Sequence, residues 1–291
     1  MTEFSKIGLL GLGASGAGIA WLFAASGRDV VVLETDQERI DAGLAVVAKS
    51  LDGGIARGEV TEDDKSTVLS RITPTTDVAG LVGVDAVIES VTENAEVKKD
   101  LLAAVAGVVG ERAPILSNTA SLSVTDLAAS LPNSGRVAGL HFLGPAPGSR
   151  TIEVVKAVQT DAGLVDRLVA LVDSLADKVA VVVKDRPGFL VNALLLPYLN
   201  DVIQEYDDGL ATVEDIDVAL RLGLGYKTGP FEMLDHVGLD VHLHATRAVH
   251  DATGDTRYAP PPLLRAMVAA GQLGEKTDSG FRTTTNTTER G

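Results

Sequence analysis

The chain carries an imidazole and a carboxylate at a spacing that suits general acid/base chemistry. His141, the only histidine among the first 235 residues, ends an apolar run (RVAGLH) typical of a short buried strand. Glu153 lies in a second strand-like run, TIEVVKAV, after a loop rich in proline and glycine. Two strands joined by such a loop bring the side chains together, and a neighbouring carboxylate orients a histidine that works near neutral pH. On these residues alone, a structural and a catalytic histidine both remain open.

A glycine-rich turn supplies the second chemical signal. Gly11, Gly13 and Gly16 form G-x-G-x-x-G between a strand-like run and a helical pattern within residues 6–34. There the glycines permit a tight turn, close approach of a pyrophosphate and packing of helix on strand, and the helix N-terminus faces the anion. Glu34 ends the next strand, where a carboxylate accepts hydrogen bonds from a ribose and repels a 2′-phosphate. The pattern predicts a dinucleotide site that favours NAD over NADP.

The elements that position these residues predict an α/β domain with a Rossmann-like sheet. The run VDAVIES (84–90) indicates another buried strand, and a helical pattern begins at residue 94. Glu93 and Lys98 lie where this strand passes into the helix, at the carboxyl end that lines the ligand crevice of a parallel sheet. We therefore expect both to neighbour the cofactor; the alternative is an ordinary loop acid and helix cation.

Residues 39–58 and 61–72 read as two helices inserted after the second strand. Lys49 and Arg57 are cations on the surface of the first of them. Their position would let them serve a phosphate-bearing substrate, although a solvated helix surface explains them equally simply.

The chain changes character after its last predicted strand, KVAVVV (178–183). A DRPG turn follows, and the pattern is helical from Phe189 onward, with Asn192 in an otherwise apolar face. The sequence thus predicts a dinucleotide-binding domain over residues 1–186 and an all-α domain over residues 187–291. We expect the four histidines of the second domain to be surface or packing residues without a metal, and the polar tail from Phe281 to add nothing to the core.

Bulk properties narrow the class of protein. The chain has 291 residues, 45% of them hydrophobic and 22% charged, as in a globular protein. A net charge of −15 argues against a nucleic-acid partner, and the lack of cysteine excludes disulfides and thiolate chemistry. The N-terminal residues lack the basic segment of a secretory signal, and no apolar stretch approaches the roughly 20 residues of a membrane span. These features predict a cytoplasmic protein.

Taken together, the motifs resemble the short-chain L-3-hydroxyacyl-CoA dehydrogenases, including the 3-hydroxybutyryl-CoA dehydrogenases. The matching segments span the chain in the family's order: GLGASGAGIA, VDAVIESVTENAEVKKDL, SNTAS, LHFLGP with the Glu153 run, DRPGFLVN with PYL, and GYKTGPFEMLDHVGLD. The resemblance implies NAD-dependent oxidation of an acyl-CoA substrate and a helical domain that forms a homodimer.

The resemblance also assigns roles to individual residues. His141 falls on the family's catalytic base, Glu153 on its partner, and Asn192 on the asparagine that helps hold the substrate. Positions that contact the cofactor in the family are here Glu34, Glu93 and Lys98, and positions that contact the substrate are Ser50, Arg57 and the serine Ser121.

Two residues depart from the family's pattern at the predicted reaction centre. Ala120 replaces the first serine of SNTSS, and Gly144 replaces the asparagine of HFFNP. Each change removes a hydrogen-bonding group and would cost on the order of 1–3 kcal/mol if a polar substrate atom were left unpaired. This keeps two alternatives open: an enzyme acting on a carrier-protein-bound hydroxyacyl group or a free hydroxy acid, and an NAD-binding protein without catalysis.

Overall fold

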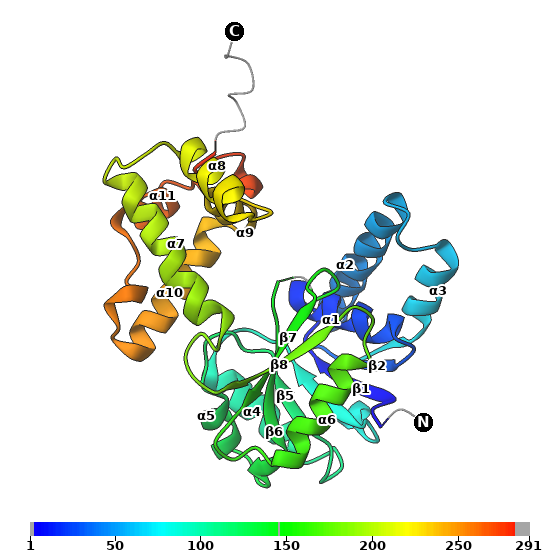
Figure 1. Cartoon of the computed structure of the whole chain (residues 1–291). Coiled ribbons are helices and arrows are strands. Elements are labelled where there is room, and N and C mark those ends of the chain that lie inside the picture. Colours follow the sequence, from blue (N-terminus) through cyan, green and yellow to red (C-terminus); the bar gives the residue numbers. More distant parts are fainter. Residues whose placement is uncertain (1–2, 145, 283–291) are drawn as a thin grey trace. The chain divides into compact units, whose positions relative to one another are not determined.

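The chain folds into two compact units, Met1–Phe189 and Leu190–Gly291, in a computed structural model that describes residues 3–144 and 146–282 (Figure 1). The first unit is an α/β domain and the second is all-helical. This confirms the predicted fold class. The sequence placed the domain boundary after residue 186, and as a functional division that boundary stays a prediction.

The first unit is built on an eight-stranded sheet in the order β3-β2-β1-β4-β5-β6-β7-β8. Neighbouring strands run parallel except β6 and β7, which are antiparallel. The strands are β1 (Lys6–Leu10), β2 (Asp29–Leu33), β3 (Ile72–Thr75), β4 (Ala86–Glu89), β5 (Ile115–Ser117), β6 (Val137–Phe142), β7 (Thr151–Lys156) and β8 (Val179–Lys184).

Helices cover both faces of this sheet because the strands are apolar on both faces. Along β1, Ile7 and Leu9 belong to the core under α1, α2, α3 and α6, whereas Leu10 belongs to the core under α4 and α5. The helices are α1 (Ala14–Ala25), α2 (Gln37–Ala56), α3 (Glu62–Ser70), α4 (Ala95–Ala106), α5 (Val124–Ala129) and α6 (Ala162–Asp173), with short 3₁₀ turns at Val78–Leu81 and Ser134–Arg136.

The edge strand β3 is an element that the sequence analysis did not anticipate. Its four residues, ITPT, follow directly on the helical pattern of α3 and include Pro74. Proline has no N–H to donate to a neighbouring strand, and so within sheets it is confined to edge strands, strand starts or bulges. β3 pairs with β2 alone at the end of the sheet, which is where a proline is tolerated.

The second unit consists of five α-helices and two 3₁₀ turns among the described residues. They are α7 (Val191–Asp207), α8 (Val213–Leu224), α9 (Pro230–Val237), α10 (Leu239–Thr253), α11 (Pro262–Ala269), and the turns Thr256–Tyr258 and Glu275–Thr277. Helix α7 contains Pro197, which has no N–H for the carbonyl one turn earlier, that of Ala193. The hydroxyl of Tyr258 donates to this carbonyl at 3.0 Å, so the acceptor that proline leaves open is satisfied.

The tail prediction is wrong for its first two residues. Phe281 lies in an aromatic cluster with Tyr206 and Phe231, at ring-centroid distances of 6.0 and 4.7 Å. The backbone N–H groups of Phe281 and Arg282 donate to the carboxylate of Asp235 at 2.9 and 2.7 Å. A single aromatic residue and one buried carboxylate thus fix the start of a segment that composition alone classed as polar. Residues 283–291 lie outside the described residues.

A polar network lies in the core of the second unit. His242 Nε2 lies 3.0 Å from Asn200 Oδ1, and Asn200 Nδ2 donates to Thr246 Oγ1 at 2.8 Å. All three residues are buried. His242 is therefore a packing residue, one of the two roles predicted for the histidines of this domain. Burial lowers the pKa of His242 from 6.5 to about 4. The folded state therefore holds this ring neutral at pH values where the unfolded chain protonates it.

The part of the chain that the structure describes contains no helix long and apolar enough to cross a membrane. Within the same residues, no group of three or more His, Cys, Asp or Glu side chains is placed to hold a metal ion.

The lowered pKa of His242 predicts a loss of stability in acid. Between these two pKa values the unfolded state binds a proton that the folded state does not bind. The stability that the neutral His242 contributes is therefore fully present above pH 6.5 and is lost as the pH falls toward about 4. We expect the free energy of unfolding to fall by about 2–3 kcal/mol from this group alone between pH 7.5 and 4.5. Urea denaturation of the wild type and of His242→Gln, which cannot titrate, measures the difference. Equal pH dependence of the two proteins would contradict the assignment.

Candidate functional site

The carboxyl ends of the parallel strands lie in one row of the sheet. The register pairs Leu33 with Leu10, Leu10 with Glu89, Glu89 with Ser117, and Ser117 with Gly139. The segments that follow these positions therefore leave the sheet at the same edge. In open α/β sheets this is the edge at which ligands bind.

The glycine-rich turn follows β1 at this edge. Gly11 has φ +91°, a left-handed value that favours glycine, and its N–H donates to the carbonyl of Leu33 at 2.9 Å. A Cβ built on Gly16 would lie 2.1 Å from the Gly11 carbonyl oxygen, so only glycine lets α1 start this close to β1. Gly13 is exposed at the N-terminus of α1, and no described atom lies within 4 Å of a Cβ built on it. This open face is the cradle that a pyrophosphate would fill.

Glu34 follows β2 and contacts the same turn. Its Oε1 accepts a hydrogen bond from the Leu12 N–H at 2.6 Å, and its Oε2 accepts one from the Thr35 N–H at 3.1 Å. The carboxylate is thus held beside the glycine-rich turn, half-buried at the end of the strand. This is the position from which an acid can accept hydrogen bonds from a ribose.

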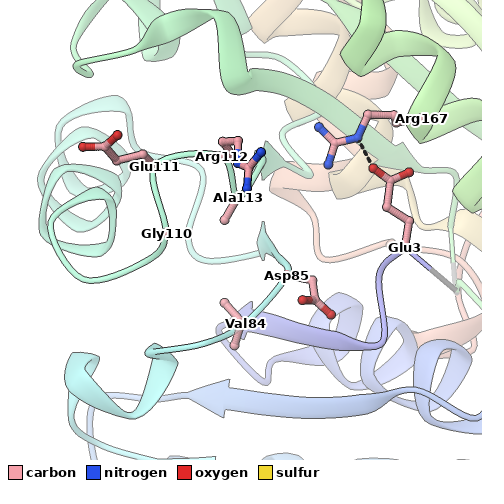
Figure 2. Close-up of a pocket in the computed structure, with 8 residues that line it drawn as sticks. All are labelled: Glu3, Val84, Asp85, Gly110, Glu111, Arg112, Ala113 and Arg167. Carbon is pink, nitrogen blue, oxygen red and sulfur yellow. Dashed lines mark hydrogen bonds and ion pairs between the residues drawn. The ribbon is translucent and has the colours of Figure 1, made fainter. Parts of the chain in front are cut away.

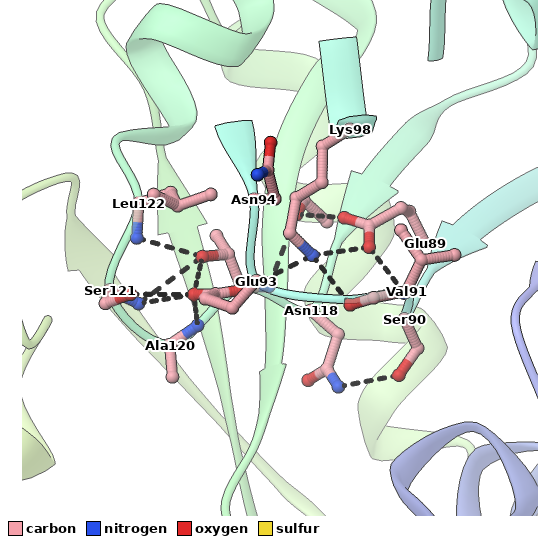
Figure 3. Close-up of polar contacts among 12 residues, drawn as sticks. Glu89, Ser90, Val91, Glu93, Asn94, Lys98, Asn118, Ala120, Ser121 and Leu122 are labelled. Carbon is pink, nitrogen blue, oxygen red and sulfur yellow. Dashed lines mark hydrogen bonds and ion pairs between the residues drawn. The ribbon is translucent and has the colours of Figure 1, made fainter. Parts of the chain in front are cut away.

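Glu93, after β4, joins its loop to the SNTAS segment after β5 (Figure 3). Its Oε1 accepts hydrogen bonds from Thr119 Oγ1 at 2.5 Å, from the N–H groups of Ala120 and Ser121 at 3.1 Å each, and from Ser121 Oγ at 2.8 Å. Burial by itself would raise the pKa of Glu93, but the hydrogen bonds from Thr119 and Ser121 and the charge of Lys98 outweigh it and hold the pKa below its usual value. Glu93 is therefore an anion that shapes the turn at Ala120.

Lys98 lies beneath Glu93 and is 1% exposed. Its ammonium contacts Glu89 Oε1 at 2.5 Å, the Val91 carbonyl at 3.2 Å and Glu93 Oε2 at 3.3 Å. An ammonium has three donors, and these contacts use three. The predicted contact of Lys98 with the cofactor stays a prediction, and in this structure its partners belong to the protein.

His141 and Glu153 face each other across the antiparallel strands β6 and β7. They are register partners, and Nδ1 of His141 lies 2.7 Å from Oε2 of Glu153. The histidine is 5% exposed and the glutamate 0%, and the Phe189 ring packs on the imidazole at a centroid distance of 5.3 Å. Because a carboxylate accepts hydrogen bonds, Nδ1 is assigned the proton and donates it to Glu153. The structure thus brings together the pair that the sequence suggested.

Asn118 is a site residue for which the sequence analysis proposed no role. Its Oδ1 accepts a hydrogen bond from the N–H of Phe142, next to His141, at 2.9 Å, and its Nδ2 donates to Ser90 Oγ at 3.2 Å. It thereby ties the ends of β4, β5 and β6 together. Its place inside the SNTAS motif was the available signal, but the identity of its partners depends on strand order.

The loop between His141 and Glu153 contains Gly144, whose φ is +66°. Glycine and asparagine are the residues that adopt this left-handed conformation most readily. A glycine at a position where the family has asparagine therefore keeps the backbone path and loses the side-chain amide. Lys178, 8% exposed, holds the far side of the loop by donating to the carbonyls of Pro147 and Ser149 at 2.8 and 2.6 Å. Residue 145 lies outside the described residues.

Ser50 and Arg57 lie on α2 and at its C-terminus, seven residues apart and both exposed. The Arg57 guanidinium donates to Glu59 Oε2 from Nε and Nη2 at 3.0 and 2.8 Å, and this hydrogen bonding raises the pKa of Arg57. A phosphate would have to replace Glu59 as its partner. Asn192 lies in the first turn of α7, in the second unit, and its predicted role stays a prediction.

A pocket of about 930 Å³ lies at the opposite edge of the sheet (Figure 2). It is lined by residues that precede the strands, among them Glu3, Asp85 and Ala113. Arg167 forms an ion pair with Glu3 there, and Asp85 Oδ2 accepts three hydrogen bonds from Ser5 and Lys6. These charged groups hold the N-terminal segment in place. Because the pocket lies at the edge opposite the glycine-rich turn, it is not the candidate active site despite its size.

Comparison with known proteins identifies the family. Residues 6–186 match the 3-hydroxyacyl-CoA dehydrogenase, NAD binding domain, and residues 188–284 match the 3-hydroxyacyl-CoA dehydrogenase, C-terminal domain. The chain is 38% identical over 279 residues to the 3-hydroxybutyryl-CoA dehydrogenase of Mycobacterium tuberculosis, covering 96% of this chain and 98% of the relative.

Solved structures agree with the sequence comparison. The crystal structure of M. tuberculosis FadB2 superposes with a TM-score of 0.92 at 38% identity, covering 96% of this chain and 99% of the other. That of (S)-3-hydroxybutyryl-CoA dehydrogenase PaaH1 from Ralstonia eutropha gives a TM-score of 0.89 at 37% identity, with the same coverage of both chains. The chain therefore belongs to the 3-hydroxyacyl-CoA dehydrogenase family and is an NAD-dependent oxidoreductase, as its motifs predicted.

Proposed function

We propose that the chain oxidises an L-3-hydroxyacyl-CoA reversibly to the 3-oxoacyl-CoA, with His141 as the general base and Glu153 as its partner. The observation that carries this proposal is the 2.7 Å contact between His141 Nδ1 and Glu153 Oε2. This buried pair lies near the carboxyl end of β6, at the sheet edge that also carries the glycine-rich turn.

In the proposed reaction, each member of the pair has a step. Glu153 engages Nδ1, which directs Nε2 to accept the proton of the substrate's 3-hydroxyl. Bound NAD would supply the acceptor for the hydride from C3 of the substrate. Glu153, buried against the ring, would then stabilise the imidazolium, as a carboxylate does in other histidine-based sites.

The cofactor would be held by the glycine-rich turn and by two acids. Gly11, Gly13 and Gly16 shape the cradle for the pyrophosphate, and Glu34 accepts hydrogen bonds from the adenosine ribose. Glu93 would line the other half of the crevice after β4, supported from below by Lys98.

The substrate would be held by groups from several elements. Ser121, whose hydroxyl donates a hydrogen bond to Glu93, would contact the substrate from the SNTAS turn. Ser50 and Arg57 on α2 would bind the coenzyme A part, the arginine as a phosphate partner. Asn192, on α7, would help to hold the substrate, as the resemblance to the family implies.

A change of substrate is the alternative that particular residues favour. The backbone N–H of Ala120 donates to Glu93, but the side chain lacks the hydroxyl of the family's serine. Gly144 lacks the side-chain amide of the family's asparagine. A carrier-protein-bound hydroxyacyl group or a free hydroxy acid would then be the preferred substrate. The buried pair of His141 and Glu153 speaks against the further alternative of an NAD-binding protein without catalysis.

We also propose a homodimer formed through the helical unit. Large apolar side chains near the end of α8 are exposed in the single chain, with Leu222 74% and Leu224 62% accessible. Leu222 lies four residues after Val218, which is 42% accessible, so the two share a face of α8. An exposed apolar helix face of this kind marks an association site. A monomeric mass in sedimentation velocity at micromolar concentration would contradict the proposal.

For location, we propose the cytoplasm, without a nucleic-acid or membrane partner. The net charge of −15 opposes attraction to phosphate backbones and anionic lipid. Recovery of the protein with the membrane or nucleoid fraction after cell lysis would count against this placement.

The two glycines that flank the cradle should respond differently to alanine. We expect Gly13→Ala to fold normally and to weaken NAD binding roughly five- to a hundredfold, because its methyl group would occupy the space of the pyrophosphate. Gly16→Ala should in addition lower the free energy of unfolding by about 1–3 kcal/mol, since its methyl group meets the Gly11 carbonyl. Calorimetric titration with NAD and urea denaturation separate the two effects. Wild-type affinity in Gly13→Ala would refute the cradle.

Replacement of the proposed base should abolish most of the turnover. We expect His141→Gln to reduce kcat/KM for acetoacetyl-CoA and NADH by roughly 10²–10⁴-fold while NADH still binds. His244→Gln, an exposed histidine of α10, is the matched control and should retain activity. Unchanged turnover in His141→Gln would show that the base lies elsewhere.

A direct comparison of carriers tests the substrate. The rate of NAD reduction by the wild type is measured with three substrates: 3-hydroxybutyryl-CoA, the same acyl group on a carrier protein, and free 3-hydroxybutyrate. We expect the highest kcat/KM for the coenzyme A ester. A higher value for either of the others would support the substrate alternative, and NAD binding without turnover on all three would support loss of catalysis.

A further inference from the structure

Glu89, at the end of β4, is a buried acid for which the proposed mechanism has no use. It is 0% exposed and sits in the row of strand ends between Leu10 and Ser117. Its Oε1 accepts hydrogen bonds from Lys98 Nζ at 2.5 Å and from the Val91 N–H at 2.7 Å, and its Oε2 accepts one from Ser117 Oγ at 2.6 Å. All three partners act as donors, and therefore Glu89 is present as a carboxylate.

The contacts of Glu89 reach both the Glu93 loop and the SNTAS turn, which follow the ends of β4 and β5 (Figure 3). On one side it holds Val91 and Lys98, and Lys98 in turn contacts Glu93 Oε2 at 3.3 Å. On the other side it holds Ser117, whose Oγ accepts a hydrogen bond from the N–H of Thr119 at 3.2 Å. Removing this one carboxylate would disturb the supports of both the Glu93 loop and the SNTAS turn.

The cluster of Glu89, Lys98 and Glu93 has two negative charges and one positive charge. Glu89 and Lys98 are fully buried, whereas the Glu93 side chain is 27% exposed and lies at the surface end. The net charge of −1 is therefore presented to the crevice through Glu93. Its field is weakly screened, because two of the three groups have no contact with solvent.

The strand order places this cluster beside the nicotinamide half of the cofactor. If the glycine-rich turn after β1 binds the pyrophosphate and Glu34 after β2 binds the adenosine ribose, the rest of the dinucleotide crosses from β1 to β4. It then extends over β4 and β5 toward His141 on β6. This step rests on the proposed function. The nicotinamide ring carries a positive charge when oxidised and none when reduced.

We propose that Glu89 is a positioning residue that, through Lys98 and Glu93, sets the charge beside the nicotinamide and makes the site favour the oxidised over the reduced cofactor. Without Glu89, the ammonium of Lys98 would neutralise Glu93. The preference for the cationic ring would then be lost.

The test measures the dissociation constants of NAD⁺ and NADH and compares their ratio among variants. In Glu89→Gln the cluster changes from −1 to neutral, so the ratio Kd(NAD⁺)/Kd(NADH) should rise about three- to tenfold. In Lys98→Met the fully buried Glu89 loses its counter-ion and takes up a proton, because an unpaired charge at such a position is strongly disfavoured. Glu93 is then the only charge of the cluster, and the ratio should stay within about twofold of the wild type. Glu111→Gln, an exposed acid at the opposite edge of the sheet, makes the same charge change and should leave the ratio within about twofold of the wild type.

The double variant Glu89→Gln/Lys98→Met separates charge from shape. It removes both buried charges and leaves Glu93 as the cluster's charge, so the ratio should return to within about twofold of the wild type. A ratio that stays where Glu89→Gln put it would refute the charge account. Equal weakening of both cofactors in Glu89→Gln would show a merely structural role and overturn the proposal.

Two further outcomes are decided by the same measurements. If Glu89→Gln does not fold, Glu93→Gln carries the test: the remaining pair of Glu89 and Lys98 is neutral, so the ratio should rise as predicted for Glu89→Gln, and an unshifted ratio overturns the proposal. Failure of the wild type to bind NAD or to turn over any hydroxyacyl substrate would instead refute the proposed function. Normal wild-type binding and turnover with unshifted ratios would refute this inference alone.

Discussion

The site depends on the alignment of strand ends in the first unit. The register that pairs Leu10 with Glu89, Glu89 with Ser117, and Ser117 with Gly139 puts the following loops at one edge of the sheet. A shift of one residue in any of these pairings would turn each side chain of that strand to the opposite face. The apolar cores on both faces oppose such a shift, because every strand would exchange its two sets of buried neighbours. Packing far from the reaction centre therefore fixes the geometry at that centre.

Burial of charge is the second constraint on the site. Glu89, Lys98 and Glu153 are at most 1% exposed, and an unpaired charge at such positions would be strongly destabilising. Lys98 contacts two acids and a carbonyl, and Glu153 is paired with His141. A loop conformation that left one of these buried charges without its partner would be strongly destabilised. The loops can therefore adopt few conformations. A buried network of this kind stabilises the fold weakly but specifies the arrangement of the loops well.

The sequence predicted the structure correctly where it follows from a local pattern of residues. It did not predict contacts between residues that are distant in the chain. The glycine-rich turn and the change to helices after β8 follow from local spacing, and both are present. The strand β3 was missed because four residues with a proline give no alternating pattern, and Phe281 because one aromatic residue in a polar tail gives no periodicity. Asn118 lies in the SNTAS motif and Glu89 in the predicted strand VDAVIES, but neither motif indicates their hydrogen-bond partners. These partners are set by the order and register of the strands, which a local sequence pattern does not encode.

The two departures from the family's pattern become intelligible when backbone and side chain are separated. At Gly144 a φ of +66° preserves the path of the loop, and at Ala120 the N–H still donates to Glu93. Both positions thus retain what the fold requires and lack the side-chain group that a bound substrate would meet in the proposed function. The acid/base pair does not use either side chain, since His141 and Glu153 hold each other across β6 and β7. The backbone therefore constrains the proposed chemistry more tightly than it constrains the substrate, and the choice of substrate is the property that these two positions can change without loss of the fold.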